Sequence, residues 1–491
     1  MNYILRQGLL GSTTYYYKTA IITFMTLFVL PYLLGPEQIG LYKYILSTAT
    51  LFASATQIGI SQSIIRFFVK LSPKQKKVLL GFSFVFILSI HLIAYFVFLI
   101  YKYKFFTPEL GKPNVLVDHF ELIFSCTLGI VLCLTIKAWY RTLFRAVFPV
   151  LIQNIYVYTA MAMPFLFLYL KIIDYRFLIY SLPALFLSAF IILILNLVRL
   201  GELKVSFRLQ ELDLSFYKDF LIYNLFSFAG SSGFTLVTKI DTFMIVPLLG
   251  LKQNGIYATV LALADIVEVP RRGLKQITVP ALSRLIASED QSTLKNFYKN
   301  ISLCQFVNAS FFFCIIISNI DHVFTFLPKG DIFSTGKNVV IFLMISRIFD
   351  SMLSYSLDIL SLSKYFKYSI LFIAFLISVS VGLNYLLIPI YGISGAAAAT
   401  ALSYLIYNSA AAIFINKNFN LNPISKKMLF PIIFMTASTT LRYIPLHSTL
   451  LVSALIKLSL ILIAYIYYIS KAKIFNFELG FSIPKENTKL S

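Results

Sequence analysis

Leu33-Leu34-Gly35-Pro36-Glu37-Gln38-Ile39-Gly40-Leu41-Tyr42 returns 215 residues later as Leu248-Leu249-Gly250-Leu251-Lys252-Gln253-Asn254-Gly255-Ile256-Tyr257, with six of the ten positions identical. A second echo follows each copy, Gly59-Ile60-Ser61-Gln62 and then Gly273-Leu274-Lys275-Gln276. Each ten-residue block joins two long apolar stretches, so the chain reads as one helical unit written twice. Such repeats, with a site between the halves, are typical of secondary transporters. We expect Gly35 and Gly250 at tight turns, where glycine is tolerated best.

The composition indicates a membrane protein. The chain has 491 residues, of which 59% are hydrophobic and 13% are charged, whereas about 25% of a soluble domain is charged. A span of the hydrocarbon core needs about 20 apolar residues. Fourteen such runs can be counted, centred near residues 24, 52, 90, 130, 157, 187, 234, 262, 310, 350, 379, 405, 437 and 460. The sequence therefore predicts an all-α integral membrane protein with 14 transmembrane helices.

The net charge of +22 is explained by membrane orientation rather than by nucleic-acid binding. Cytoplasmic loops of membrane proteins are enriched in Lys and Arg. With the N-terminus placed inside, the inner segments hold 28 of the 42 Lys and Arg residues, the outer segments hold 9, and 5 lie in or beside spans. This asymmetry predicts that both the N-terminus and the C-terminus are cytoplasmic.

The order of the runs predicts the domain organisation. Six runs precede the polar segment 199–218, six follow it, and two close the chain. Because the repeated blocks are an even number of helices apart, the halves should be parallel and related by a pseudo-two-fold axis along the membrane normal. We expect an N-terminal six-helix bundle at 1–200, a cytoplasmic linker at 201–218, a C-terminal six-helix bundle at 219–416, and two further helices with a cytoplasmic tail at 417–491.

Several charged residues fall inside or at the ends of predicted spans. A charge in a span costs about 2.5–3.5 kcal/mol on insertion scales, so each is a candidate functional residue. Structural ion pairing is the alternative for each of them, and Lys18 could simply snorkel to the surface. The candidate cations are Lys18, Lys239, Arg271, Arg272 and Arg347, and the candidate ion-coupling or charge-pairing acids are Asp241, Asp265, Glu268, Asp350 and Asp358.

The spacing of these charges predicts which helix faces they share. Asp265, Glu268 and Arg272 form one stripe, and Glu268 precedes Arg272 by four residues, the favourable order for an ion pair. Arg347, Asp350, Ser354 and Asp358 form a second stripe on an otherwise apolar helix, which should face protein or water rather than lipid. We expect Lys239 and Arg347 to face a common hydrated cleft between the halves, with Asp241 and Asp350 as their counter-charges.

The chain resembles the polysaccharide exporters of the multidrug, oligosaccharidyl-lipid and polysaccharide flippase superfamily. The resemblance is carried by residues 34–42 and 59–67, by Lys239-Ile240-Asp241 ahead of Leu249-Gly250 and Gly255-Ile256-Tyr257, and by Tyr391-Gly392-Ile393-Ser394-Gly395-Ala396-Ala397-Ala398-Ala399-Thr400. The 6+6+2 pattern of runs extends it over the whole chain. One departure is Lys239, where the family often has Arg, so a point charge replaces a bidentate contact to pyrophosphate.

The resemblance implies a V-shaped transporter with a central cavity in the bacterial inner membrane. Its cargo would be an undecaprenyl-pyrophosphate-linked oligosaccharide, flipped from the inner to the outer leaflet for O-antigen, capsule or exopolysaccharide synthesis. The five candidate cations would bind the pyrophosphate. A polysaccharide polymerase and glycosyltransferases are the implied protein partners. Three alternatives stay open: a lipid II flippase, a drug and cation antiporter of the multidrug extrusion branch, and a membrane-embedded glycan polymerase or glycosyltransferase.

The sequence also predicts several absences. No Gly-rich loop ending in Lys-Ser or Lys-Thr occurs, so direct use of ATP is not expected. The four cysteines lie in apolar stretches without the spacing of a metal site or a disulfide framework. We therefore expect no catalytic residues, metal, cofactor or nucleic-acid partner. A proton or sodium gradient acting through Asp241, Asp265 or Glu268 is the hypothesis for energy coupling.

Overall fold

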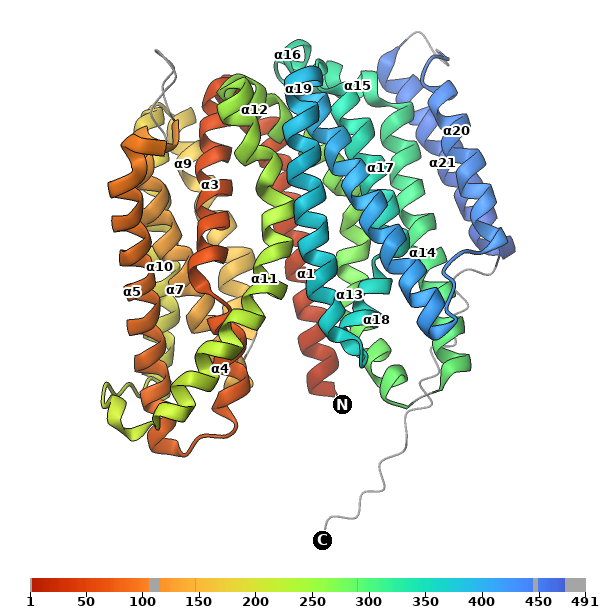
Figure 1. Cartoon of the computed structure of the whole chain (residues 1–491). Helices are drawn as coiled ribbons and strands as arrows, with labels where there is room; N and C mark the ends of the chain where they lie inside the picture. Colours follow the sequence, from red (N-terminus) through yellow and green to blue (C-terminus); the bar gives the residue numbers. More distant parts are fainter. Residues whose placement is uncertain (1, 106–114, 146, 289, 445–448, 473–491) are drawn as a thin grey trace.

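The computed structural model describes residues 2–105, 115–145, 147–288, 290–444 and 449–472 (Figure 1). Every regular element in these ranges is helical. The elements up to residue 199 are α1 (Asn2–Phe24), η1 (Met25–Val29), α2 (Leu30–Leu33), α3 (Pro36–Gln57), α4 (Ile60–Phe68), α5 (Pro73–Phe105), α6 (Val115–Asp118), α7 (Phe120–Thr142), α8 (Val147–Leu151), η2 (Ile152–Tyr156), α9 (Val157–Tyr169) and α10 (Tyr175–Arg199).

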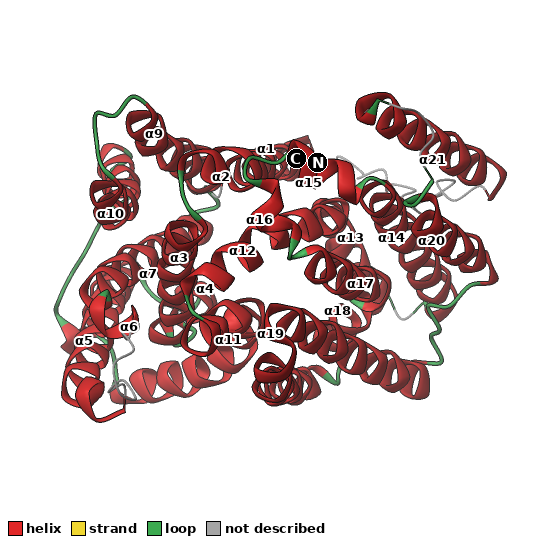
Figure 2. Ribbon diagram, turned by 90° about the horizontal axis from the view of Figure 1, so that it is seen from above, coloured by secondary structure: helices red, strands yellow, loops and turns green. Residues whose placement is uncertain are grey.

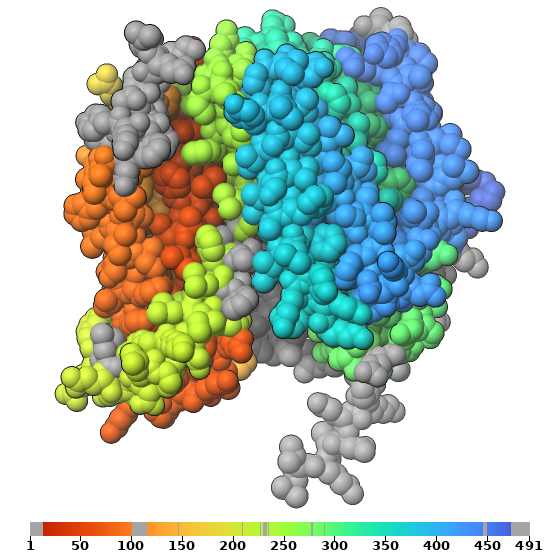
Figure 3. Space-filling model, in the orientation of Figure 1, coloured from red at the N-terminus to blue at the C-terminus, as the bar shows by residue number. Residues whose placement is uncertain are grey.

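The remaining elements continue the all-helical pattern, and α11 crosses the face of the molecule diagonally (Figure 1). They are η3 (Leu209–Glu211), α11 (Leu214–Leu249), α12 (Leu251–Asp265), η4 (Ile266–Glu268), α13 (Val269–Ala287), α14 (Gln291–Ser318), α15 (Ile320–Phe326), α16 (Gly330–Ser334), α17 (Lys337–Leu353), α18 (Tyr355–Leu362), α19 (Phe366–Phe419), η5 (Lys426–Met428), α20 (Leu429–Leu441) and α21 (Leu450–Ala472). In the space-filling view, the C-terminal helices α20 and α21 form the edge opposite α5 (Figure 3).

The helices confirm a multi-pass membrane protein. Eight helices of the described ranges are long and apolar enough to span a membrane, or nine if α17 and α18, bent by 42°, form one span. Each of the fourteen predicted centres lies in a helix, and α19 contains two of them. A straight helix of 54 residues would be roughly 80 Å long. Instead, Gly392, with φ 60° and ψ −140°, breaks α19, and the chain reverses there (Figure 1).

The first repeated block forms a turn into α3. The backbone amide of Gly35 donates to Oε1 of Gln38 at 3.0 Å, and Pro36 is the first helical residue. The residues that cap and start α3 are therefore contained in the repeated block itself. Gly250 has φ +88°, as expected of a glycine turn, but Gly35 has φ −79°, which any residue adopts. The prediction of a glycine-dependent turn is therefore wrong for Gly35, because a proline start and a side-chain cap already fix that turn.

The glycines that the repeat does require are Gly40 and Gly255, which lie where α3 crosses α12 (Figures 1 and 2). A Cβ on Gly40 would lie 1.9 Å from the carbonyl oxygen of Leu251, and one on Gly255 would lie 1.8 Å from that of Pro36. The buried amide of Asn254 donates to the carbonyl oxygen of Gly40 at 2.9 Å. The two copies of the repeat thus pack directly on each other, backbone against backbone.

The second echo also marks close contacts between distant parts of the chain. Gly59 has φ +73°, and its added Cβ would lie 2.5 Å from the carbonyl oxygen of Asn224 on α11. On Gly273 of α13, an added Cβ would lie 2.2 Å from the hydroxyl of Tyr16 on α1. Each echo glycine therefore accommodates the first long helix of the opposite half.

The first part of the predicted linker 201–218 is an extended connection, whereas η3 and the start of α11 at Leu214 lie within its second part. Residues 202–208 form no regular element, and the amide of Ser206 donates to the carbonyl oxygen of Lys77 on α5 at 3.0 Å. Gly81 leaves the space for this contact, since its added Cβ would lie 2.3 Å from the carbonyl oxygen of Ser206. The polar composition of this segment agrees with a crossover outside the apolar core.

A charged cluster ties α20 to the bundle at the upper end of Figure 1. Asp321 on α15 accepts from Arg442 at 2.7 Å and from Lys337 at 2.6 Å. These hydrogen bonds, that of Arg442 above all, lower the pKa of Asp321 to about 2. The buried ammonium of Lys457 on α21 donates to the carbonyl oxygens of Ser318 and Arg442 beside it.

This cluster predicts a defined acid sensitivity. A depressed carboxyl pKa stabilises the fold above the ordinary Asp pKa, about 4, and the stabilisation is lost as the pH falls toward the folded-state pKa. The free energy of unfolding should therefore decrease between about pH 4 and pH 2. In Asp321→Asn this decrease should be smaller, as measured by thermal unfolding of the purified protein at several pH values. An identical pH profile for both proteins would contradict the assignment.

Candidate functional site

A buried carboxylate on α11 has only neutral hydrogen-bond partners. Asp241 is 7% exposed. It accepts from the hydroxyls of Tyr257 and Thr400, both at 2.6 Å, and from the amide of Asn384 at 3.1 Å. Within the described residues, no Lys or Arg forms an ion pair with it. A membrane-embedded carboxylate in such a shell is suited to take up a proton or a small cation.

A second buried acid is clamped by two arginines. Glu268, at the junction of η4 and α13, is 2% exposed and pairs with Arg271 and with Arg272, the latter at 2.6 Å. This confirms the predicted pair of Glu268 and Arg272. Arg271 is itself buried and also contacts Asp350 on α17 at 2.7 Å. Because removing one member would leave an unpaired buried charge, this group is tightly interdependent.

Arg347 on α17 does not pair as the sequence predicted. Its Nη2 and Nε lie 2.9 Å and 3.2 Å from Oδ1 of Asp265, and its Nε lies 3.7 Å from Glu268. Asp350, the expected counter-charge, pairs with Arg271 instead. The prediction was wrong because the facing segment at residues 265–271 supplies closer partners than the neighbours on the same helix face. Asp241 does not pair with Lys239 either, which agrees with their spacing, because residues two apart on a helix point to different faces.

Lys239 lies on α11 without a direct ion pair in the described part of the chain. It is half-buried on α11 and, among the described residues, has no hydrogen-bond or ion-pair partner. It lies within electrostatic reach of Asp265 and of three cations, Lys18, Arg272 and Arg347. Lys43 on α3, which donates to Thr26 at 2.8 Å, interacts with both Lys239 and Asp265. We call this group the central charge cluster: Lys18, Lys43, Lys239, Asp265, Arg272 and Arg347.

The central charge cluster lies where the first helix of the chain meets the C-terminal half. Arg272 donates to the hydroxyl of Tyr15 on α1 at 3.2 Å. The ammonium of Lys18 lies 4.9 Å from the ring centroid of Tyr158 on α9. Cations outnumber acids in the cluster, so its net charge is positive. Its chemistry therefore suits a bulky anion with hydrogen-bonding groups.

The structure brings five of the ten candidates together in the central charge cluster: Lys18, Lys239, Asp265, Arg272 and Arg347. Glu268 pairs with Arg272, and Arg271 and Asp350 are linked to it in turn. Asp241 forms the separate hydrogen-bonded site described above. Asp358, on α18, lies apart and pairs with Lys275 at 2.7 Å. Sequence reasoning missed Lys43, although its position at the edge of a span was visible, and it missed the partners of Asp241. The repeat could have identified Tyr257, because it is the last residue of the second block. Nothing in the sequence around Asn384 or Thr400 indicates that they contact Asp241.

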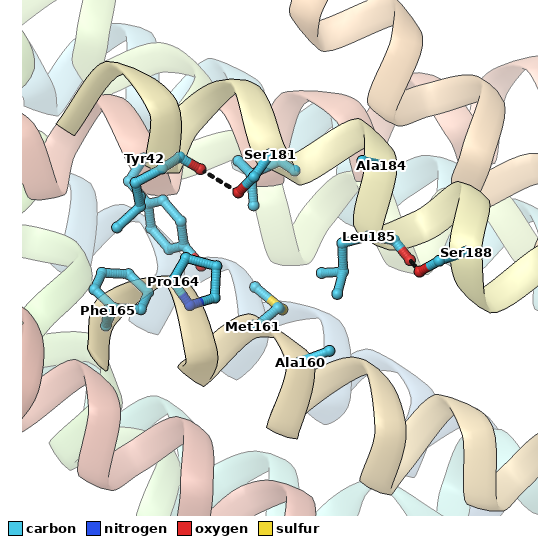
Figure 4. Close-up of a pocket in the computed structure, with 11 residues that line it drawn as sticks. Tyr42, Ala160, Met161, Pro164, Phe165, Ser181, Ala184, Leu185 and Ser188 are labelled. Carbon is cyan, nitrogen blue, oxygen red and sulfur yellow. Dashed lines mark hydrogen bonds between the residues drawn. The ribbon is translucent and has the colours of Figure 1, made fainter. Parts of the chain in front are cut away.

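Apolar cavities also lie outside the central charge cluster. The first, about 310 Å³, is bounded by α3, α9 and α10, where Tyr42 packs against Phe165 (Figure 4). The hydroxyls of Ser181 and Ser188 at its wall donate to carbonyl oxygens of their own helix, so they offer little to a ligand. The second cavity, about 870 Å³, lies between α14, α17 and α20 and is lined mainly by Ile, Leu, Met and Phe side chains.

Comparison with known proteins places the chain in a family. The profile of the family described as "Polysaccharide biosynthesis protein" matches residues 5–286. No curated protein sequence matches the chain significantly. Among solved structures, the lipid II flippase MurJ in an inward closed conformation has a TM-score of 0.68 at 14% identity, covering 94% of this chain and 100% of that one.

Multidrug transporters of the MATE family share the fold as well. An inward-facing member of the MOP superfamily has a TM-score of 0.62 at 15% identity, covering 87% of this chain and 96% of the other. An outward-facing one has a TM-score of 0.53 at 15% identity, with coverage of 89% and 94%. The all-helical fold with multiple spans and these matches agree on a multi-pass membrane protein with the fold that MurJ and the MATE transporters share. The chain belongs to the polysaccharide biosynthesis protein family.

Proposed function

We propose that this protein flips an undecaprenyl-pyrophosphate-linked oligosaccharide from the inner to the outer leaflet of the bacterial cytoplasmic membrane. The observation that carries the proposal is the central charge cluster, a net positive site built from α1, α3, α11, α12, α13 and α17. A pyrophosphate at the bilayer midplane needs cations that are not already neutralised. Lys239 supplies such a cation, and Arg272, with 43% of its side chain exposed, can turn toward the cargo.

The proposal assigns roles to the remaining candidates. Lys18, Lys43 and Lys239 would act as point charges on the pyrophosphate, whereas Arg272 and Arg347 offer forked donors. Arg271 is buried and held by Glu268 and Asp350, so we assign it to supporting the site rather than to contacting cargo. Asp265 would release Arg347 when the anion arrives. The apolar cavity on the other face of α17 would accommodate part of the polyprenyl chain.

Alternating access would occur between two parallel six-helix bundles, 1–200 and 219–416, with two more helices making fourteen spans. We place the repeated blocks at the outer end and both termini in the cytoplasm, following the distribution of Lys and Arg. The backbone contact of Gly40 and Gly255 would then be the outer closure, and it is formed in this structure. The higher TM-scores with the inward conformations, 0.68 and 0.62 against 0.53, agree with that assignment.

Energy coupling is proposed at Asp241. Its carboxylate is buried, forms no direct ion pair among the described residues although Arg347 lies within electrostatic reach, and is linked by hydrogen bonds to α12 and α19. Binding a proton or a sodium ion would remove its charge and change the hydrogen bonds that connect three helices. An ion taken up here could therefore bias the bundle between two conformations.

The alternatives make different demands on the site. A drug and cation antiporter would need an acidic cavity, whereas cations dominate the central charge cluster. A polymerase or glycosyltransferase would need catalytic side chains in outer loops, which are short in this chain. A lipid II flippase would bind the same polyprenyl pyrophosphate, so the site itself does not separate it from our proposal. Only the sugar portion does.

The test is flipping by the full-length protein in proteoliposomes. Fluorescent polyprenyl-pyrophosphate oligosaccharide, lipid II and a cationic dye would be offered separately, and the accessible fraction followed with a membrane-impermeant quencher. We expect exchange of the oligosaccharide between leaflets, no uptake of the dye, and no change in glycan length. Dye transport alone, preference for lipid II, or glycan elongation would each overturn the proposal in favour of the corresponding alternative.

A further inference from the structure

Polar side chains continue from Asp241 toward the lower end of Figure 1 along the second arm of α19. Thr400, Tyr404 and Asn408 follow one another at four-residue intervals, so they lie on one face, about 6 Å apart. Thr400 donates to Asp241, and the amide of Asn408 lies 3.4 Å from Oδ1 of Asp350. Tyr404, 1% exposed, lies between them and interacts electrostatically with both carboxylates.

The series continues on α17 and α18. Asp350, Ser354 and Asp358 are again four residues apart, and the first two are only 3% exposed. Asp358 contacts Lys275, and their side chains are 22% and 26% exposed, so the series reaches the surface there. We call Thr400, Tyr404, Asn408, Asp350, Ser354 and Asp358 the polar column. It joins the buried Asp241 to a partly exposed ion pair through the interior of the C-terminal half.

Several atoms of the polar column are buried without a hydrogen-bond partner among the described residues. These are the hydroxyl of Tyr404, Oδ1 of Asn408 and the hydroxyl of Ser354, and the hydroxyls of Ser346 and Ser351 lie on neighbouring turns of α17 in the same state. Native proteins pair nearly all buried polar atoms, because leaving one unpaired costs the full desolvation of the group. Because these atoms lie on adjoining helix faces, shared water molecules would give them the partners that the side chains do not. Sites of this kind bind water.

We propose that the polar column is a hydrated path by which protons pass between Asp241 and the cytoplasm. A proton released by the carboxyl of Asp241 would move along hydroxyls and water to Asp350 and Asp358, and the reverse movement would reload Asp241. The proposal extends the proposed coupling role of Asp241 and depends on it for its function. It adds the residues that give this carboxyl access to one side of the membrane.

The residues along the path favour a proton over a metal cation. The guanidinium carbon of Arg347 lies 5.9 Å from the ring centroid of Tyr404, at the upper part of the polar column. Further along, Arg271 forms an ion pair with Asp350, and Lys275 forms one with Asp358. These fixed cations raise the cost of any positive charge in the column. A proton is nevertheless relayed between hydroxyls and water without the shell of oxygen ligands that Na⁺ needs, and Arg271 and Lys275 already hold the carboxylates that could supply such ligands. Around Asp241 itself, the facing groups are Tyr257 from α12, Arg347 from α17, and Asn384, Thr400 and Tyr404 from α19.

Hydration of the polar column can be tested without any transport assay. In a cysteine-free background, Ser351→Cys and Ser354→Cys would be exposed to a small charged thiol reagent from the cytoplasmic side of inverted vesicles. The control is Val307→Cys on α14, which is buried to the same degree, 1% against 1% and 3%, but in an apolar core. We expect labelling of Ser354→Cys, in the polar column, and of Ser351→Cys, beside it, roughly tenfold faster than labelling of the control. Equal rates at all three positions would overturn the proposal.

Proton passage is tested by Tyr404→Phe, which keeps the ring and removes the hydroxyl. In proteoliposomes with an internal pH dye, we expect cargo-dependent proton uptake to fall roughly tenfold while cargo binding is unchanged. Tyr465→Phe on α21, also 1% exposed but outside the column, should behave as wild type. Wild-type proton uptake in Tyr404→Phe, or flipping driven by a sodium gradient alone, would refute the path. Failure to flip the oligosaccharide would refute the cargo but leave the labelling test standing.

Discussion

Lys239→Gln is expected to lower the rate of oligosaccharide flipping about 100-fold at matched protein level. Loss of one desolvated charged contact to a ligand costs about 2–5 kcal/mol, and each 1.4 kcal/mol corresponds to a factor of ten. Since Lys239 has no ion-pair or hydrogen-bond partner in the described part of the chain, its removal leaves no buried acid uncompensated. Folding should therefore be unaffected. The measurement is leaflet exchange in proteoliposomes together with thermal unfolding of the same preparation.

The control is Lys252→Gln, which removes an exposed lysine of α12 outside the central charge cluster and should flip cargo at the wild-type rate. Lys239→Arg should retain most activity. Arg347→Gln should also abolish flipping, but it leaves Asp265 without its ion-pair partner, so part of its effect will be on stability. Arg347→Lys should keep partial function. Wild-type flipping by Lys239→Gln would show that this cation is structurally and functionally dispensable.

Gly40→Ala is expected to destabilise the folded protein by about 3 kcal/mol, since overpacking at a closed contact costs 1–3 kcal/mol and occasionally more. The new Cβ would lie 1.9 Å from a backbone oxygen, which cannot rotate away as a side chain could. Gly255→Ala meets the same obstacle at 1.8 Å from the carbonyl of Pro36. Either change should separate α3 from α12. Thermal unfolding followed by the fluorescence of the single Trp139 would measure the loss.

A matched glycine provides the control. Gly382 lies inside α19, and nothing is found within 4 Å of its added Cβ. Gly382→Ala should therefore stabilise the protein by about 0.5–1 kcal/mol through helix propensity alone. If the alanine variants at residues 40 and 255 unfolded at the same temperature as Gly382→Ala, the close crossing of the two repeats would be ruled out.

The sequence determined the elements because its signals are local. Apolar runs of span length are visible without a structure, and all fourteen predicted centres lie in helices. The proline start and Gln38 cap of α3 are encoded within four residues, and so is the ion pair of Glu268 and Arg272, one helical turn apart. The repeat identified Gly40 and Gly255 as equivalent, although it did not reveal that these two glycines pack on each other.

Only the tertiary structure decided which charges meet. Arg347 and Asp350 share a helix face, yet each pairs with a residue of the facing segment 265–271, because helix packing sets those distances and sequence spacing does not. Asn384 and Thr400 reach Asp241 across more than 140 residues. The two copies of the repeat also differ at this site. The residue equivalent to Asp241 at the offset of 215 is Thr26, whose hydroxyl accepts a hydrogen bond from Lys43. Composition and periodicity fix the helices, whereas the positions of their charges depend on how the helices pack.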